Sequence, residues 1–196
     1  MAELEIDRAT TALVVIDLQK GIAAMGRQFQ PHSVGTVISN AAELAAAFRK
    51  NGMPVLLVHV VASEAERFTP IADEQQLRNA SPPKDWSDFV PELAQKESDI
   101  VVTKKQWGAF YGTDLELQLR RRGIKTIVLC GISTNHGVES TARFAYEYGF
   151  QQIFAEDAMT SMSAEMHRLA IDTAFKRMGR VRKTEGILKS LVQSAP

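Results

Sequence analysis

The sequence predicts an α/β domain of three layers, in which helices cover both faces of a mostly parallel sheet. Short, continuously apolar runs alternate along the chain with stretches of helical period, a pattern typical of parallel strands that are buried on both faces. The chain has 196 residues, a length that suits one domain and is short for two. We therefore expect a single domain over residues 1–196.

The apolar runs predict the strands of this sheet. Each run is short and is bounded by polar or turn-forming residues, as expected for buried strands. Pro54 opens the second run, a position at which its missing N–H costs little. In chain order, the predicted strands are residues 12–17, 54–61, 99–103, 126–130, 151–155 and a short one at Val181.

The predicted helices follow from apolar spacing and from signals at helix ends. Residues 34–50 have apolar side chains near a helical period, and Asn51-Gly52 is a typical stop. Thr113 and Glu116 match a capping box, which predicts that a helix starts at Thr113. The predicted helices are residues 34–50, 113–122, 137–148, 163–177 and 184–192.

Residues 62–98 are the exception, because they show no clean period. Prolines interrupt this segment repeatedly. A connection of this length inside a compact domain is usually either functional or disordered. Trp86 and Phe89 favour a packed excursion over a disordered linker. We therefore expect a cap over the site at about residues 62–98.

The composition excludes several classes of protein. Lys+Arg and Asp+Glu are equal at 23 each, so the charge balance indicates neither a nucleic acid nor a membrane surface as partner. The apolar runs are far too short to span a membrane, and the acidic start is unlike a secretory signal. The single cysteine excludes an intrachain disulfide framework and fits a reducing compartment. We expect a cytoplasmic protein that acts on a small molecule.

Three residues follow predicted strands at the edge where parallel sheets bind ligands. Such ligands sit beyond the carboxyl ends of the strands, near the point where the strand order reverses. Asp17 ends the first strand, Lys104 follows the third, and Gly137 lies just past the fourth. The strand assignments alone therefore predict that these residues converge on a site. The alternative is structural: a turn-forming aspartate, a solvated lysine and a tight turn at the glycine.

Three motifs in one order make this reading more specific. They are D-L-Q at residues 17–19, K-K-Q-W-G-A-F at residues 104–110 and G-I-S-T-N-H-G-V-E-S-T-A at residues 131–142. With these motifs the chain resembles the isochorismatase-like superfamily, also called the cysteine hydrolases, from residue 11 to about 160. The resemblance implies a hydrolase with a Rossmann-like, six-stranded sheet of strand order 3-2-1-4-5-6.

The resemblance also implies a catalytic role for each of the three strand-end residues. Asp17 would be a general acid or base and Lys104 its electrostatic partner, while Gly137 stands where most of the superfamily has its nucleophilic cysteine. Members have a non-proline cis peptide bond at the position of Ile132–Ser133, so we expect one here. Cys130 lies inside an apolar strand and is expected in the core, where it would not replace the missing nucleophile.

Further residues near these motifs are candidates for binding a substrate, although packing or exposure to solvent would also explain them. A metal site of the nicotinamidase type needs an Asp-x-His set and further histidines in the cap, and residues 62–98 contain no histidine. We therefore expect no metal and no other cofactor. The candidate substrate-binding residues are Gln19, Trp107, Phe110, Ser133 and His136.

Three functions remain open at this stage. True isochorismatases, which cleave a vinyl ether by protonation and capture of water, resemble this chain in having glycine at the cysteine position. Ser133-Thr134 looks closer to the amide-hydrolase branch, which argues against that assignment and for descent from cysteine hydrolases with loss of the thiol. A second function is hydrolysis of another small substrate by water that Asp17 activates. The third is a catalytically silent homologue that binds a metabolite or acts through its oligomer. An isochorismatase would also need basic residues to bind the two carboxylates of its substrate, and Arg67 and Arg78 are candidates for this role. The resemblance further implies a homo-oligomer, either a dimer or a tetramer.

Overall fold

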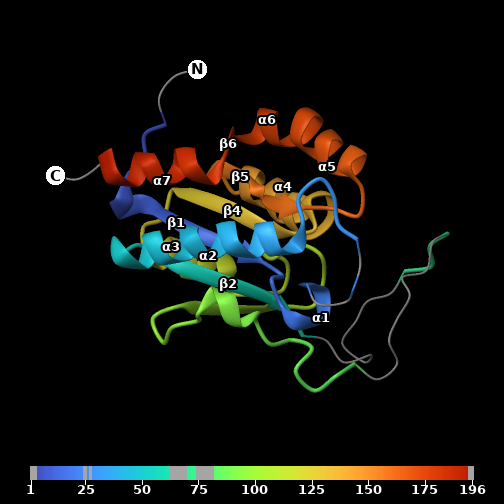
Figure 1. Cartoon of the computed structure of the whole chain (residues 1–196). Coiled ribbons are helices and arrows are strands. Elements are labelled where there is room, and N and C mark those ends of the chain that lie inside the picture. Colours follow the sequence, from blue (N-terminus) through green and yellow to red (C-terminus); the bar gives the residue numbers. More distant parts are fainter. Residues whose placement is uncertain (1–3, 24–25, 27, 62–69, 74–81, 194–196) are drawn as a thin grey trace.

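The computed structural model describes residues 4–23, 26, 28–61, 70–73 and 82–193. Within this part of the chain, the strands form one sheet of order β3-β2-β1-β4-β5-β6 (Figure 1). Every neighbouring pair in that sheet is parallel. The predicted fold class and strand order are therefore confirmed. The strands are β1 (Thr11–Ile16), β2 (Val55–Val60), β3 (Ile100–Lys104), β4 (Thr126–Ile132), β5 (Gln151–Thr160) and β6 (Arg180–Arg182).

The strand order reverses between β1 and β4, which makes the carboxyl ends of these two strands the switch point of the sheet. Ile16 pairs with Gly131 at this end. Gly131 has a φ of 121°, and a Cβ at this position would lie 2.0 Å from the carbonyl oxygen of Ile16. Only glycine therefore fits between the two strands here.

Helices cover both faces of the sheet (Figure 1). On one face, α2 (Val34–Lys50) and α7 (Thr184–Gln193) share a core with Leu13 and Val15. On the other face, α3, α4 and α5 share a second core with Val14 and Ile16. Successive residues of β1 alternate between the two cores because strand side chains point to opposite faces. The remaining elements are η1 (Arg8–Thr10), α1 (Lys20–Ala23), η3 (Pro91–Leu93), α3 (Leu115–Arg121), the π-helical turns η4 (Thr134–Val138) and η5 (Ile171–Phe175), α4 (Glu139–Glu147), α5 (Ala164–Ala170) and α6 (Lys176–Met178).

The predicted start of α3 is wrong. The helix begins at Leu115, and the capping box does not form. The Thr113 hydroxyl donates to the carbonyl oxygen of Ala109 at 2.5 Å and accepts from the N–H of Leu115 at 3.1 Å. Glu116 lies 3.5 Å from Arg120 on the next turn. Thr113 therefore supports the preceding loop, and the sequence pattern matched a capping box by coincidence.

β5 is longer than predicted. It runs to Thr160, whereas the predicted strand ended at residue 155. The adjacent acidic residues Glu156 and Asp157 hid this extension, since charged pairs are rare inside buried strands. The register between β4 and β5 shifts at this level of the sheet. Asp157 accepts hydrogen bonds from the N–H and the hydroxyl of Thr184 at 2.7 and 2.8 Å. It therefore caps the start of α7.

The described end of the predicted cap, residues 82–98, packs beside the carboxyl end of β1. Trp86 lies so close to Gly21 that a Cβ on the glycine would be 2.1 Å from the indole ring. The last part of the segment thus packs against the domain, and its role as a cap stays a prediction. The rest of the cap prediction falls on residues 62–69 and 74–81, including Arg67 and Arg78, which lie outside the described residues.

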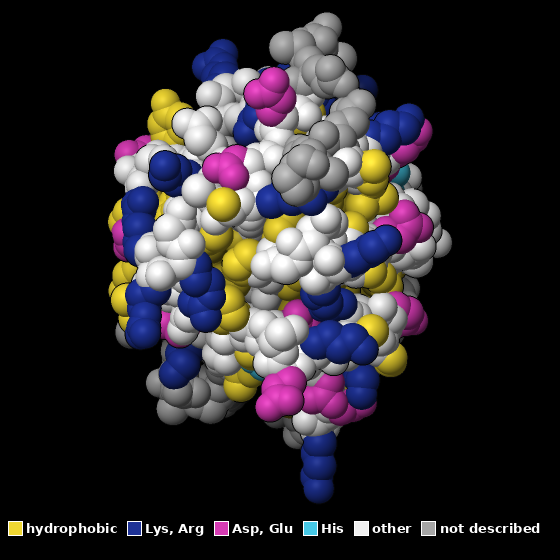
Figure 2. Space-filling model, turned by 90° about the vertical axis from the view of Figure 1, so that its left-hand side faces the viewer, with side chains coloured by type: hydrophobic (Ala, Val, Ile, Leu, Met, Phe, Trp, Pro, Cys, Tyr) yellow, Lys and Arg dark blue, Asp and Glu magenta, His cyan; other side chains and the backbone are white. Residues whose placement is uncertain are grey.

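The surface agrees with the balanced composition. On the side of the molecule opposite α1, basic and acidic side chains lie among apolar ones (Figure 2). Among the described helices, none combines the length and the apolar character that crossing a membrane would require.

Candidate functional site

A buried ion pair lies at the carboxyl ends of β1 and β3. Asp17 directly follows β1 and is 5% exposed, and Lys104 ends β3 and is 1% exposed. The Asp17 Oδ2 atom lies 2.8 Å from the Lys104 Nζ atom. The Lys104 ammonium also donates to the carbonyl oxygen of Trp107 at 2.6 Å. Asp17 and Lys104, the two charged residues predicted at strand ends, are thus in direct contact.

The backbone at Asp17 turns sharply to place its carboxylate. Its φ is 54°, in the left-handed region that aspartate tolerates better than most residues. Its N–H donates to the carbonyl oxygen of Val58 at 2.9 Å. Such conformations persist where the surroundings enforce them, and they gather at functional sites.

Burial raises the pKa of the Asp17 carboxyl to about 6, and the Lys104 ammonium and His59 offset only part of this rise. Its Oδ1 atom is buried and has no hydrogen-bond partner among the described residues. A carboxyl group with this pKa can both give and take a proton near neutral pH. The free oxygen leaves it able to do so toward a bound molecule.

Gly137 lies directly beside the ion pair. A Cβ at this position would be 3.1 Å from Asp17 Oδ2 and 3.4 Å from Lys104 Nζ. It would also lie 3.1 Å from Cγ2 of Ile16. Any side chain at position 137 would therefore point at the carboxylate and crowd it. Glycine leaves this approach to the pair open.

The turn that carries Gly137 is fixed by hydrogen bonds. The Ile132–Ser133 peptide bond before it is cis, as the resemblance predicted. The Ser133 carbonyl oxygen accepts from the N–H groups of His136 and Val138 at 3.1 and 3.2 Å. The Thr141 hydroxyl donates to the carbonyl oxygen of Gly137 at 2.7 Å. The Ser133 hydroxyl is buried without a hydrogen-bond partner among the described residues, which leaves it available to a ligand.

Two of the candidate substrate-binding residues meet on the rim of this site. The rings of Trp107 and His136 are in edge-to-face contact, with their centroids 4.8 Å apart. Trp107 is 52% exposed, and burial lowers the pKa of the half-buried His136. The rim is therefore an aromatic surface joined to the ion pair through the contact between Lys104 and Trp107.

Gln19 and Phe110, which were also candidates, have structural contacts. The Gln19 amide donates to the carbonyl oxygens of Val60 and Trp86 at 3.3 and 3.2 Å and accepts from the N–H of Val60 at 2.7 Å. It thereby ties the end of β1 to β2 and to the described end of the cap. Phe110 is buried and packs against the ring of Phe150. A substrate-binding role for either residue stays a prediction.

Cys130 lies in the core, as predicted. It is fully buried in β4, and burial raises the pKa of its thiol to about 12. Because the thiolate is the reactive form of cysteine, this side chain is both inaccessible and unreactive near neutral pH.

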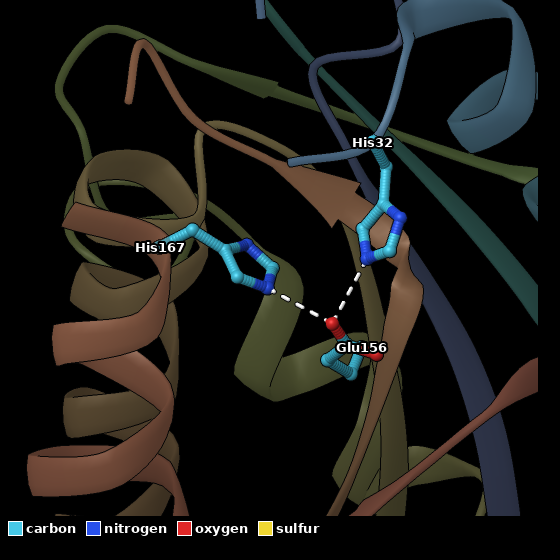
Figure 3. A group of neighbouring side chains, drawn as sticks. All are labelled: His32, Glu156 and His167. Atoms are coloured by element: carbon cyan, nitrogen blue, oxygen red, sulfur yellow. Dashed lines mark hydrogen bonds and ion pairs between the residues drawn. The ribbon is translucent and has the colours of Figure 1, made fainter. Parts of the chain in front are cut away.

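A second polar cluster consists of His32, Glu156 and His167. It adjoins the turn that carries Gly137, and sequence reasoning missed it. Glu156 Oε1 is 2.9 Å from Nε2 of His32 and 3.2 Å from Nε2 of His167 (Figure 3). The other ring nitrogen of His167 lies 2.8 Å from the Thr134 hydroxyl, which belongs to the turn. His32 and Glu156 are 124 residues apart, so no local motif joins them. The only signal in the sequence is an acidic residue within an apolar run.

An α/β domain with a buried carboxylate–ammonium pair at the switch point of its sheet has the architecture of an enzyme for small molecules. The isochorismatase domain matches residues 11–186. The chain therefore belongs to the isochorismatase family, and it is a hydrolase of that family.

Individual relatives agree with this assignment. The chain is 52% identical to the isochorismatase family protein YecD of Escherichia coli O157:H7, over 96% of this chain and 100% of that protein. It is 32% identical to the ureidoacrylate amidohydrolase RutB of Methylobacterium radiotolerans, over 86% of this chain and 74% of that protein. A solved structure of an isochorismatase family protein from Burkholderia thailandensis is 40% identical, with a TM-score of 0.82 over 97% of this chain and 100% of that chain.

Proposed function

We propose that the protein hydrolyses a small metabolite without a covalent enzyme intermediate. Asp17 acts as the general acid and base, Lys104 stabilises its carboxylate, and Gly137 leaves room for the substrate. The observation that carries the proposal is the buried Asp17–Lys104 pair, whose two atoms are 2.8 Å apart. The Asp17 Oδ1 atom is free of partners among the described residues. This arrangement supports proton transfer, and it provides no nucleophilic thiol at the site.

Cleavage of a vinyl ether would use the protonated form of Asp17. The carboxyl group gives its proton to the terminal carbon of the enol ether, which forms an oxocarbenium ion. Water adds to this cation and returns a proton to Asp17, and the hemiketal collapses to a ketone and an alcohol. The Lys104 ammonium stabilises the carboxylate between these two steps. General acid–base catalysis of this kind contributes roughly 10²–10⁴-fold to a rate.

Hydrolysis of an amide would use the ionised form of the same residue. The 32% identity to the amidohydrolase RutB favours this variant. Asp17 would take a proton from water, which attacks the carbonyl carbon, and would then give the proton to the leaving nitrogen. The buried Ser133 hydroxyl, which has no partner among the described residues, lies on the adjoining turn and would donate to the developing oxyanion.

The test is a substrate panel with two variants. Isochorismate reports cleavage of an enol ether through pyruvate release, and ureido and carbamoyl amides report amide hydrolysis through ammonia release. We expect turnover of one class, falling roughly 10²–10⁴-fold in Asp17→Asn. The matched control is Asp172→Asn, which removes a carboxylate that is 49% exposed on the surface and should leave the rate unchanged.

Two results would overturn the proposal. Equal rates in Asp17→Asn and in the unmodified protein would show that the carboxylate does not carry the reaction. Absence of turnover across the panel, together with saturable binding of one of its compounds, would support the silent metabolite-binding homologue.

We also propose that the protein forms a homo-oligomer. Large apolar side chains are exposed on and beside α4 and α5, where single exposed residues would be unremarkable but several together favour an interface. A sizing column checks this: elution as a single species of about the chain mass, 21.7 kDa, would contradict it. The exposed residues are Phe144, Tyr146, Tyr148, Met162, Met166 and Leu169.

A further inference from the structure

The His32–Glu156–His167 cluster has the composition of a metal site. The ligand atoms of its three side chains all lie within 4.8 Å of one another, and the described residues contain no other such group. We propose that this cluster binds one divalent transition-metal ion of the zinc class. The expectation of no metal rested on the lack of histidine in residues 62–98, and this cluster is built from other parts of the chain.

Three separate parts of the fold position the cluster. His32 lies in the loop before α2, Glu156 in β5 and His167 in α5. The loop is fixed because the Thr160 hydroxyl donates to the carbonyl oxygen of His32 at 2.7 Å. His167 is 3% exposed, so its ring has little freedom. Figure 3 shows both imidazole rings directed at the carboxylate between them.

The spacing of the ligand atoms is close to that of a tetrahedral ion. Ligands about 2.0–2.1 Å from zinc in a tetrahedron are roughly 3.3 Å apart. The two contacts of Glu156 Oε1, at 2.9 and 3.2 Å, already approximate two edges of that tetrahedron. The third edge, between one ring nitrogen of His32 and one of His167, is at most 4.8 Å. Rotation of the half-buried His32 ring would close any excess over the tetrahedral distance.

The surroundings also fit a metal ligand at His167. A metal-bound histidine commonly uses its second nitrogen to donate to a polar group, which fixes the ring and its tautomer. Nδ1 of His167 has such a partner in the Thr134 hydroxyl at 2.8 Å. Two histidines and a glutamate leave a fourth position for water, as in open zinc sites.

Lys183 is the one competing cation that pairs with this cluster among the described residues. Its ammonium lies 2.8 Å from the other carboxylate oxygen of Glu156, Oε2, and its side chain is 63% exposed. The metal would use Oε1, so the two cations need not share an oxygen. An exposed lysine can also turn toward solvent at little cost, since surface ion pairs contribute roughly 0–1 kcal/mol.

The experiment uses the full chain after chelation and dialysis. Zinc is titrated in against a competing chelator, and cobalt(II) replaces it for absorption spectroscopy. We expect one equivalent of zinc per chain, a cobalt spectrum of four-coordinate type, and a rise in Tm of about 5–10 °C at a hundredfold excess over Kd. His32→Gln should weaken the affinity for zinc roughly 100-fold or more, given that changes outside the ligand set already cost 10–100-fold.

His59→Gln is the matched control. His59 is also half-buried, but it bonds the Ser87 carbonyl oxygen and the Thr103 hydroxyl, away from the cluster. The His59→Gln variant should bind zinc with the same affinity as the unmodified protein. If His32→Gln fails to fold in the presence of chelator, Thr134→Val replaces it, with an expected loss of roughly tenfold. No saturable zinc binding, or equal affinity in His32→Gln and His59→Gln, would overturn the proposal.

Discussion

Asp17 and Glu156 are both carboxylates beside cationic or imidazole groups, but their environments shift their pKa values in opposite directions. Asp17 is almost completely buried, and the loss of solvent raises its pKa to about 6 despite the contact with Lys104. Glu156 is half-buried, and hydrogen bonds from His167, Lys183 and His32 together outweigh its burial, so its pKa is lowered. The number of donors and the access of water decide between the two outcomes.

The difference separates a group suited to proton transfer from a group suited to holding cations. A carboxyl with a pKa near neutral exists in both forms under working conditions. A carboxylate with a lowered pKa stays ionised and keeps its ligand geometry. The same side-chain chemistry is therefore suited to two different purposes in one domain.

The largest expected effect is that of removing the cation from the buried pair. Lys104→Met leaves the Asp17 carboxylate buried without its partner, which should cost roughly 3–5 kcal/mol of unfolding free energy near pH 8. The cost should shrink as the pH falls, because loss of the Lys104 ammonium raises the pKa of Asp17 further and the carboxyl then becomes neutral. Urea unfolding near pH 8 and at lower pH measures it. Lys105→Met, at the exposed neighbouring position, is the control, and equal losses in both variants would remove the energetic role of the pair.

The pH dependence of stability tests the raised pKa of Asp17. Because its pKa in the folded state, about 6, exceeds the ordinary value of 3.8, its contribution to stability is present below pH 3.8 and lost as the pH rises through 6. The loss amounts to roughly 3 kcal/mol. Unfolding free energies measured from pH 4 to 6 should show this loss in Asp172→Asn but not in Asp17→Asn. Parallel curves for both variants would contradict the raised pKa.

Neutralising Glu156 should have a smaller effect. Glu156→Gln weakens the hydrogen bonds to His167 and Lys183, and a hydrogen bond to a charged group contributes about 1.5–3 kcal/mol. Lys183, whose side chain is 63% exposed, regains water when the contact weakens, so we expect a loss of about 2 kcal/mol at pH 7 in chelator. A loss as large as that of Lys104→Met would mean that the two carboxylates do not differ as described.

Position 137 should separate stability from activity. Gly137→Ala adds a Cβ about 3.1 Å from Asp17 Oδ2, which the carboxylate accommodates only by moving a few tenths of an ångström. Alanine is favoured over glycine in helices by about 0.5–1 kcal/mol, so we expect stability to change by under about 1 kcal/mol and activity to fall about tenfold. Gly35→Ala in α2, where an added Cβ would lie 3.9 Å from Oγ of Ser33, should stabilise the protein without affecting turnover.

The smallest effect concerns Cys130. Iodoacetamide should label this thiol only after unfolding and should leave the activity of the folded protein unchanged, because the side chain is buried and its pKa is about 12. Mass spectrometry before and after urea treatment measures the labelling. Rapid labelling of the folded protein with loss of activity would restore a catalytic role for the thiol.

Sequence reasoning succeeded where a residue's position follows from one strand. Asp17 and Lys104 each end an apolar run, and parallel strands bring such ends to one edge of the sheet, so their contact was predictable. The contacts of Gln19 and Phe110 depend on which neighbours pack beside them, and no periodicity encodes that. The His32–Glu156–His167 cluster requires the register of β5 and the path of a distant loop. Glu156 and its neighbour Asp157 also hid the end of β5 from sequence reasoning.

Two glycines at the switch point differ in what they allow. At Gly131, both the φ of 121° and the distance of 2.0 Å from a would-be Cβ to the Ile16 carbonyl oxygen exclude any other residue. At Gly137, the closest such contacts are side-chain atoms at 3.1 Å. The sheet therefore requires the first glycine, whereas the second can be replaced without a clash with the backbone. A single substitution at position 137 can alter the surroundings of the Asp17–Lys104 pair without rebuilding the sheet that supports it.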